Sequence, residues 1–283
     1  MEYYKNSLYS WNDCNIFGNS SPDTSYQIKL AKTFNEYGCI IIPNLISPKY
    51  CDEILEHILI NMKDTKKIKY GEINSNYKRK DAIIHIDDAL QYIKKIYNKI
   101  QLFCQIVLKN CKIVECSSLI SFPGSYPQMW HQDTEYDEKD GDLVSFGLAL
   151  DDLTPDMGPL EVYLKSHKIY DRFDELCEEH GLLDDNYDLN DEITNGIKKQ
   201  PTEDLCKILN FKKGICSCKK GSLIIWSSKI IHRGGKNKKK MRPIFYFSLL
   251  GKGRKPNGST YSLLGKEYKC SDILHTPRSS SST

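Results

Sequence analysis

The sequence of 283 residues lacks any long hydrophobic run. Its longest apolar stretches, residues 39–42 and 223–226, have the length of single strands, whereas a helix that spans a membrane needs about 20 apolar residues. The first residues also lack the basic and apolar segments of a secretory signal, so export is not expected. We therefore expect a cytoplasmic protein that has no membrane partner.

Cysteine is plentiful, but the disulfide framework of a small secreted protein is missing. The 11 cysteines are scattered along the chain, and a chain of this length can bury a core without covalent staples. Only Cys216 and Cys218 form a close pair that could begin a zinc site, and no second pair lies at zinc-finger spacing. The pattern favours buried, reduced thiols over a bound zinc ion.

Acidic residues are missing from one long stretch of an otherwise balanced chain. The chain has 40 Lys and Arg against 37 Asp and Glu, which gives a net charge of +3. Asp171 to Asp204 contains 12 acids and 3 bases, while Lys207 to Lys255 contains 15 bases and no acid. Such blocks are usually solvated faces that complement one another. The alternative is a basic face, with Lys236 to Lys240 on a hairpin, that attracts an anionic substrate.

A nucleic-acid partner is not expected from these basic residues. No aromatic residues alternate with them, and no nucleic-acid-binding module is recognisable in the sequence. We expect a small-molecule substrate, and a protein that is a monomer or a weak dimer.

Residue patterns divide the chain into an arm, one domain and a tail. Residues 1–26 are polar and predict a loosely held N-terminal arm. Residues 27–253 predict a single domain, with an acidic insertion at 169–212 that has a weak helical pattern. Residues 254–283, which end in RSSSST, predict a flexible C-terminal tail.

The patterns predict a mainly β fold with flanking helices. A helix ends at Tyr37-Gly38 before a buried strand at 39–42, another begins with Ser47 and Pro48, and a third runs from about 89 to 108. From residue 113 onward, short apolar runs broken by Gly, Pro and polar turns are typical of an antiparallel barrel or sandwich. The expected strands are 113–122, 128–134, 143–150, 159–164, 214–218, 222–227, 229–234 and 242–250.

Two distant motifs carry residues that can bind a metal ion. In an extended strand residues i and i+2 point to the same side, so His131 and Asp133 can offer two ligands to one ion. This pair alone is weak evidence, because such a pair is more often a surface hydrogen bond. His232 ends a later apolar strand, and it would complete a set of two histidines and one carboxylate. Three such ligands leave three open positions on an octahedral ion, the arrangement of non-haem Fe(II) in oxygen-activating enzymes.

The strand after His232 opens with Arg242. Its planar guanidinium suits a dicarboxylate cosubstrate, because it binds a carboxylate through two hydrogen bonds and stays charged. Two neighbouring strands would then present an imidazole and a guanidinium side by side.

Four segments, in this order, resemble the phytanoyl-CoA dioxygenase family of Fe(II)- and 2-oxoglutarate-dependent oxygenases. They are FNEYGCIIIPNLIS at 34–47, HQD at 131–133, GPLEVYLKSHK at 158–168 and HRGGKNKKKMRP at 232–243. The resemblance implies a double-stranded β-helix, a jelly-roll or cupin-like barrel whose mouth holds iron. It also implies that O2 and 2-oxoglutarate are converted to succinate and CO2 while a small organic molecule or an acyl thioester is hydroxylated.

The resemblance assigns roles to individual residues. His131, Asp133 and His232 match the metal ligands of the family. Arg242 matches the arginine that binds the distal carboxylate of 2-oxoglutarate, and Gln128 matches a glutamine that some members place near the other carboxylate.

Other positions modify these expectations. The family often has a small hydroxyl residue where this chain has Gly234, so the cosubstrate is expected to lack that helper. Halogenases of the family have a small residue in place of Asp133, so hydroxylation is expected rather than halogenation. Trp130 and His167 are expected to be structural, and Trp226 to lie in the core or beside the cosubstrate.

Two rival functions use the same residues differently. One is a catalytically silent barrel that binds an anionic ligand or a protein partner through its basic face. The other is a cupin-like barrel that holds a different metal and binds no 2-oxoglutarate. The presence of all three metal ligands together with Arg242 favours the oxygenase.

Overall fold

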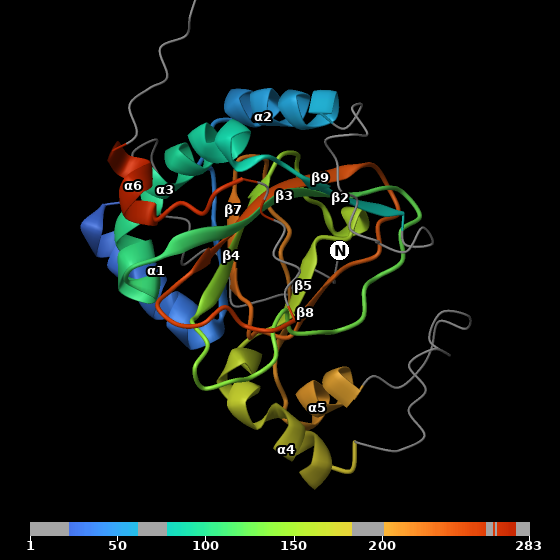
Figure 1. Ribbon diagram of the computed structural model, residues 1–283. Coiled ribbons are helices and arrows are strands. Elements are labelled where there is room, and N and C mark those ends of the chain that lie inside the picture. Colours follow the sequence, from blue (N-terminus) through green and yellow to red (C-terminus); the bar gives the residue numbers. More distant parts are fainter. Residues whose placement is uncertain (1–22, 62–77, 183–200, 259–262, 264, 276–283) are drawn as a thin grey trace, which may run out of the picture.

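The computed structural model describes residues 23–61, 78–182, 201–258, 263 and 265–275 (Figure 1). The strands are β1 (Cys39–Ile42), β2 (Arg79–Ile83), β3 (Lys112–Ser121), β4 (Leu143–Ala149), β5 (Leu160–Tyr163), β6 (Lys213–Ile215), β7 (Leu223–Ser227), β8 (His232–Gly234) and β9 (Arg242–Leu250). In the described part of the chain they form two sheets, with the orders β1-β7-β4-β9-β3-β2 and β6-β5-β8. Every pairing within the two sheets is antiparallel.

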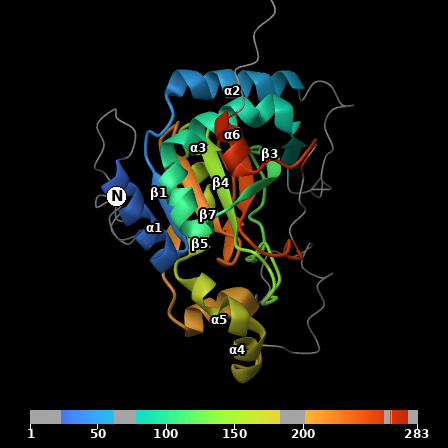
Figure 2. The same cartoon turned by 60° about the vertical axis from the view of Figure 1, so that its left-hand side comes forward.

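Helices cover one face of the larger sheet. They are α1 (Thr24–Tyr37), α2 (Pro48–Asn61), α3 (Ile86–Leu108) and α6 (Cys270–His275). The helices α4 (Phe173–Glu179) and α5 (Pro201–Ile208) lie away from this face, and η3 (Pro155–Met157) and η4 (Ser166–Arg172) are short 3-10 turns. Helix α3 lies on the sheet through the edge-to-face contact of Phe103 with Phe146, and α1 lies on α3 through Phe34. Figure 2 shows these helices beside the strands of the sheet.

The two faces of the larger sheet have different chemistry, because alternate residues of a strand point to opposite sides. Phe245 and Phe247 of β9 and Phe146 of β4 point to the helices and are fully buried. The residues of β9 that alternate with these phenylalanines, such as Arg242 and Tyr246, point to the opposite side, toward the smaller sheet. This side carries the polar residues, so the face that does not bind the helices is the one available for chemistry.

Local sequence explains where the first helices begin and end. Asp23 caps α1, since its side chain accepts a hydrogen bond from the amide of Tyr26. Gly38 ends α1 with φ of +78°, and a Cβ at this position would lie 2.4 Å from Nδ1 of His167. Nε2 of His167 lies 3.1 Å from the carbonyl oxygen of Asn35, so His167 has the structural role expected from the sequence.

The expected strand at 128–134 is wrong. Only His131 pairs there, through an isolated bridge to His232. The amide of Gln128 donates to the carbonyl of Gly234, so three steps along this segment face two steps along β8. One extra residue between two pairings breaks a ladder and leaves the segment irregular.

Three other expectations differ from the structure. Strand β2 was not expected, because its sequence RKDAI is mostly charged. Strand β8 starts only at His232, because residues 228 and 229 form a turn. The segment expected to be a flexible tail contains α6, and its Cys270 and Ile273 are buried in the main core. Residues 1–22 of the expected N-terminal arm lie outside the described residues.

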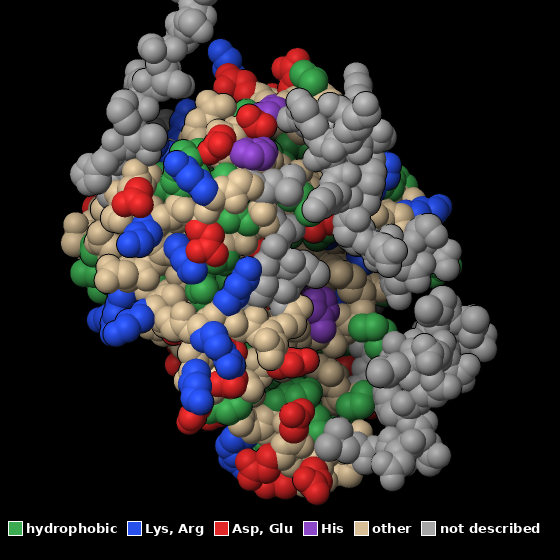
Figure 3. All heavy atoms as spheres, viewed as in Figure 1, with side chains coloured by type: hydrophobic (Ala, Val, Ile, Leu, Met, Phe, Trp, Pro, Cys, Tyr) green, Lys and Arg blue, Asp and Glu red, His purple; other side chains and the backbone are tan. Residues whose placement is uncertain are grey.

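The acidic insertion contains two helices, as its weak helical pattern predicts. Leu176 and Cys177 of α4 pack on Leu205 of α5 and form a small separate core. Acidic side chains gather on the surface at this lower end of the molecule (Figure 3). Residues 183–200 of the insertion lie outside the described residues. No described helix combines the length and the apolar character that crossing a membrane requires.

Phe103→Ala should destabilise the fold, because it removes a fully buried ring between α1 and the larger sheet. We expect a loss of about 3–5 kcal/mol in the free energy of unfolding, measured by urea denaturation. Ile106→Ala is the matched control, since Ile106 lies on the same helix and is 40% exposed. The control should lose less than about 1 kcal/mol, and equal losses for the two variants would contradict this assignment of the core.

Candidate metal and cosubstrate site

Three side chains from distant parts of the chain meet at one point. Nε2 of His131 lies 3.8 Å from Oδ1 of Asp133, and Nε2 of His232 lies 3.4 Å from the same oxygen. One ligand atom from each residue lies within 4.8 Å of the other two. Among the described residues, no other group of three His, Cys, Asp or Glu side chains comes this close. The structure thus brings together the three ligands predicted from the sequence.

Backbone contacts set the protonation of both histidines. Nδ1 of His131 lies 2.8 Å from the carbonyl oxygen of Met129, and Nδ1 of His232 lies 2.9 Å from that of Ile230. A carbonyl oxygen can only accept, so Nδ1 carries the hydrogen in each ring. Both Nε2 atoms therefore remain on the side of Asp133, as a metal ion needs from imidazole ligands, and the hydrogen that His232 shares with Asp133 would leave when the ion binds.

Electrostatics at this point also suit a cation. Burial, followed by the neighbouring His232, lowers the pKa of His131 below its ordinary value. Burial alone would raise the pKa of Asp133, but the charge and hydrogen bond of His232 together lower it. The site therefore offers a carboxylate and an uncharged imidazole at neutral pH.

The antiparallel backbone fixes the two histidines relative to each other. The amide of His131 donates to the carbonyl of His232 at 3.0 Å, and the amide of His232 donates back at 2.9 Å. Ser166, from the GPLEVYLKSHK segment, accepts a hydrogen bond from the amide of Ile231 at 2.8 Å. This segment thus positions Ile231, the residue that precedes His232.

Arg242 is a buried cation without an acidic partner among the described residues. Its side chain is the first of β9, only 3% of it is exposed, and its Nε has no hydrogen-bond partner there. Burial, followed by the positive charge of Arg79, lowers the pKa of Arg242 to about 9. Such a guanidinium is still charged at neutral pH, and an anion that bound it would offset the cost of burying it.

Arg79 is a second buried arginine on the face that carries Arg242, and no sequence motif predicted its role. Arg79 pairs with Ser121, and Ser121 pairs with Arg242, so the three side chains point to one face in a row across β2, β3 and β9. Nη2 of Arg79 donates to the carbonyl oxygens of Gly234 and Gly235, at 3.1 and 2.8 Å. The row thus connects Arg242 to the strand that carries His232.

Gln128 and Arg79 fill the space beside Gly234. Oε1 of Gln128 accepts a hydrogen bond from the amide of Gly234 at 2.8 Å. A Cβ on Gly234 would lie 2.6 Å from this oxygen and 3.2 Å from Nη2 of Arg79. A hydroxyl residue at this position would displace the end of the Gln128 side chain, so the two polar side chains occupy the place that it would take.

Comparison with known proteins agrees with this geometry. The sequence profile of the phytanoyl-CoA dioxygenase family matches residues 34–242, which is most of the chain. The chain belongs to the phytanoyl-CoA dioxygenase family. Among the curated proteins, no sequence matches it.

Several solved structures share the fold of this family member at low sequence identity. The non-heme alpha ketoglutarate dependent epimerase SnoN, from nogalamycin biosynthesis, is similar with a TM-score of 0.61 at 12% identity, over 84% of this chain and 89% of SnoN. SnoN in complex with Fe3+, alpha ketoglutarate and nogalamycin RO gives 0.58 at 14%, over 86% and 98%. The alpha ketoglutarate dependent carbocyclase SnoK gives 0.57 at 9%, over 87% and 89%.

Trp226 holds the carboxylate ligand of this family member in place. Its Nε1 donates to Oδ2 of Asp133 at 3.3 Å, which leaves Oδ1 turned toward the histidines. The indole lies over Gly147, where a Cβ would come within 3.1 Å of the ring. The sequence allowed Trp226 a place in the core or beside the cosubstrate, but the hydrogen bond depends on a register that the sequence does not reveal.

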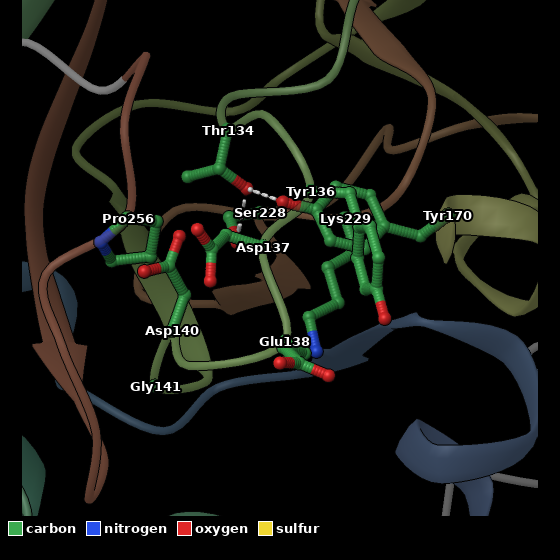
Figure 4. A pocket seen from close by; sticks show the side chains of 10 residues that line it. All are labelled: Thr134, Tyr136, Asp137, Glu138, Asp140, Gly141, Tyr170, Ser228, Lys229 and Pro256. Carbon is green, nitrogen blue, oxygen red and sulfur yellow. Dashed lines mark hydrogen bonds between the residues drawn. The ribbon is translucent and has the colours of Figure 1, made fainter. Parts of the chain in front are cut away.

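The loop that follows Asp133 is also held firmly. The amide of Asp133 donates to the carbonyl of Ser228 at 2.9 Å, and the hydroxyl of Tyr170 donates to Thr134 at 2.9 Å. These side chains line a cavity of about 180 Å³ beside the loop, with Pro256 at its other side (Figure 4).

Other singled-out residues lie outside the site. Trp130 is buried against Tyr163, as expected, and Arg233 stacks on its ring with 4.4 Å to the centroid. Cys216 is buried with its sulfur 3.9 Å from that of Cys39. On the basic hairpin, Lys240 forms an ion pair with Asp151 at 2.6 Å.

Trp226→Phe should weaken Fe(II) binding about 10- to 100-fold, because loss of a hydrogen bond to a metal ligand typically has an effect of this size. The affinity is measured by anaerobic titration of the purified protein. His131→Ala should abolish specific binding, and Trp130→Phe, which changes a buried indole outside the site, should bind like the wild type. If Trp226→Phe and Trp130→Phe bind iron equally well, the orienting role of Trp226 is wrong.

Proposed function

We propose that this protein is an Fe(II)- and 2-oxoglutarate-dependent oxygenase that oxidises a small organic molecule. The observation that carries the proposal is the meeting of three donor atoms from His131, Asp133 and His232 on the sheet face that also carries the buried Arg242. Membership of the phytanoyl-CoA dioxygenase family supports it. The silent barrel is disfavoured, because it would leave the three converging ligand atoms without a role.

His131 and His232, through Nε2, and Asp133, through Oδ1, would hold the iron. The two Nδ1 hydrogen bonds to backbone carbonyls and the indole of Trp226 keep these atoms aimed at one point. When bound, the iron supplies the activation of O2 and the oxidising power. The protein supplies the fixed geometry and the exclusion of water from the buried side of the site.

Arg242 would bind the distal carboxylate of 2-oxoglutarate. Burial and the charge of Arg79 lower its pKa to about 9, and a bound carboxylate would raise this pKa again. Arg79 adds a second positive charge near the first, and with Gln128 it takes the space beside Gly234 where the family often has a hydroxyl residue. Gln128 lies against Gly234 and remains our candidate for a contact with the other carboxylate.

The two antiparallel sheets would face each other as the double-stranded β-helix of this family. Their shared fold with SnoN and SnoK supports this arrangement. With Asp133 present, we propose hydroxylation rather than halogenation as the reaction. SnoN is an epimerase and SnoK a carbocyclase, so other substrate oxidations belong to the same chemical class.

We also propose a cytoplasmic, monomeric or weakly dimeric protein. The ten cysteines in the described residues are all free thiols, which favours a reducing compartment. A single domain of residues 27–253 would contain the whole site.

Arg242→Ala should weaken 2-oxoglutarate binding by about 100-fold or more, because it removes a buried, charge-assisted contact. Binding is measured by calorimetry on the anaerobic Fe(II)-loaded protein, and turnover by release of succinate in air. Arg242→Lys should recover part of the affinity, since it restores the charge without the planar fork.

Arg172→Ala is the matched control, because Arg172 is exposed on η4 and pairs only with acids on the surface. It should bind 2-oxoglutarate like the wild type. An Arg242→Ala protein that binds iron and 2-oxoglutarate normally would exclude the proposed cosubstrate site. A wild type that binds iron but no 2-oxoglutarate would favour a differently metallated barrel.

A further inference from the structure

The face of the larger sheet that carries Arg242 also carries a carboxylate that the proposed reaction does not use. Asp81 of β2 is in register with Leu119 of β3, which in turn is in register with Ile244 of β9. Directly opposite residues share a face, and Arg242 lies two residues before Ile244. Asp81 therefore points to the same side as Arg242.

Solvent reaches this face on β9, β3 and β2, toward the β2 edge of the larger sheet. Five side chains are only partly buried, whereas their neighbours on the helix side, such as Ile120 and Phe245, are fully buried. The five are Asp81, Ile83, Leu119, Ile244 and Tyr246. A strand face that is partly open to solvent is available to a ligand. On this face the side chains around the one carboxylate are mainly aliphatic.

A continuous wall leads from the metal ligands to this carboxylate. Trp226 donates to Asp133, and its indole lies over Gly147 of β4. Gly147 is in register with Tyr246, whose hydroxyl donates to Oδ2 of Asp81 at 3.2 Å. A molecule lying along the wall has one end at the metal ligands and the other at Asp81.

The carboxylate of Asp81 is held in place but lacks a counter-charge. Ser117 donates to Oδ1 and Tyr246 to Oδ2, so each oxygen accepts one hydrogen bond and can accept another. No Lys, Arg or His of the described residues lies within ion-pair distance of it. Burial raises the pKa of Asp81, and these two hydrogen bonds counteract the rise. A buried carboxylate of this kind is best complemented by a cation.

We propose that Asp81 anchors the substrate, and that the substrate is an aliphatic molecule with a basic nitrogen. The ammonium group would bind Asp81, and the aliphatic part would lie on Ile83, Leu119 and Ile244. This inference rests on the proposed oxygenase function and adds the class of substrate to it. It differs from the expectation of an anionic substrate, which came from the exposed lysines of the 236–240 hairpin.

The test compares n-hexylamine with 1-hexanol, which has the same shape but no charge at neutral pH. Binding to the anaerobic protein loaded with Fe(II) and 2-oxoglutarate is measured by calorimetry. The wild type should bind the amine about 10-fold more tightly than the alcohol, and Asp81→Asn should lose this preference. Tyr246→Phe, which frees one side of the carboxylate, should reduce the preference in part.

Asp171→Asn is the control, since it changes an exposed carboxylate outside this face. It should keep the preference for the amine. Equal binding of amine and alcohol by the wild type, or an unchanged preference in Asp81→Asn, would overturn the inference. Asp81→Asn should still bind iron and 2-oxoglutarate. A wild type that binds neither of them would refute the proposed oxygenase function rather than the role of Asp81.

A second inference rests on a separate pair of thiols. The sulfurs of Cys111, just before β3, and Cys270 of α6 lie 2.8 Å apart, and both side chains are buried. The amide of Cys270 donates to the carbonyl of Cys111 at 2.9 Å, next to the antiparallel bridge of Lys112 with Lys269. Hydrogen-bonded antiparallel partners have Cα atoms about 5.5 Å apart, which is within the range that a disulfide spans.

Residues 256–258, which follow β9, lie against the loop that follows Asp133. The amide of Glu135 donates to the carbonyl of Asn257 at 3.1 Å, and a Cβ on Gly258 would lie 3.0 Å from the carbonyl oxygen of Asp133. Pro256 lines the cavity beside this loop (Figure 4). The chain continues from these residues to α6, so a covalent bond that fixes α6 also restrains the residues that contact the loop after Asp133.

We infer that Cys111 and Cys270 form a disulfide when the protein meets hydrogen peroxide. The hydrogen bond shared with Cys270 lowers the pKa of Cys111, which favours its thiolate as the attacking group. The thiolate takes one oxygen from the peroxide and becomes a sulfenic acid, and the hydroxide that leaves combines with the proton given up by Cys111 to form water. The thiol of Cys270 then attacks this sulfur and a second water leaves, so two thiols lose two electrons and two protons.

The test treats the full-length protein with peroxide, blocks the remaining thiols and digests it without reduction. Mass spectrometry should find a peptide that links residues 111 and 270, and Cys270→Ser should not give it. Cys177→Ser, which changes a cysteine elsewhere, should give the same linked peptide as the wild type. Hydrogen exchange at the amide of Glu135 should slow in the oxidised wild type and not in Cys270→Ser. A missing linked peptide, or unchanged exchange at Glu135, would overturn the inference.

Discussion

The site depends on one backbone contact, the pair of hydrogen bonds that His131 and His232 exchange. These bonds bring together two residues that are far apart in the chain, and they set the distance between the two imidazoles. Each imidazole is then turned by its own Nδ1 hydrogen bond to a carbonyl two residues earlier. The ligand atoms are thus placed by the backbone, so a metal ion that binds them does not have to order flexible side chains.

The irregular path of residues 128–134 has a consequence for this contact. A regular strand would continue the ladder and would place Gln128 one position away from its observed partner. The extra residue instead lets the amide and the side chain of Gln128 both bind Gly234, while His131 remains paired with His232. The break in the strand therefore contributes to the site, because it brings the polar side chain of Gln128 to Gly234 of β8, which Arg79 also contacts.

The alternation along β9 separates stability from chemistry. Phe245 and Phe247 contribute to the helix-facing core, while Arg242 and Tyr246 of the same strand face the site. Buried charge on the site face destabilises the fold unless ligands offset it, so the apolar face must supply the stability. A substitution on one face should then affect unfolding and a substitution on the other should affect binding.

Parts of this arrangement were readable from the sequence for clear physical reasons. His131 and Asp133 are two residues apart and so are local. His232 and Arg242 stand out at the ends of neighbouring strand patterns, and the resemblance to a family assigned their roles. Arg79 was missed because its strand RKDAI is mostly charged, which hides it among surface sequences. The hydrogen bond from Trp226 was also missed, because it depends on the register between strands that are far apart in the chain.

The same reason explains why substrate recognition could not be predicted from the sequence. Asp81 acquires its role only through Tyr246 and Ser117, and these three residues meet because β2, β3 and β9 pair in one particular register. A shift by one residue would turn Asp81 to the helices, where an uncompensated carboxylate would be expelled. Ala82 and Ile84, which alternate with Asp81, are buried on the helix side and oppose this shift, so residues that stabilise the fold also decide which charge faces the substrate.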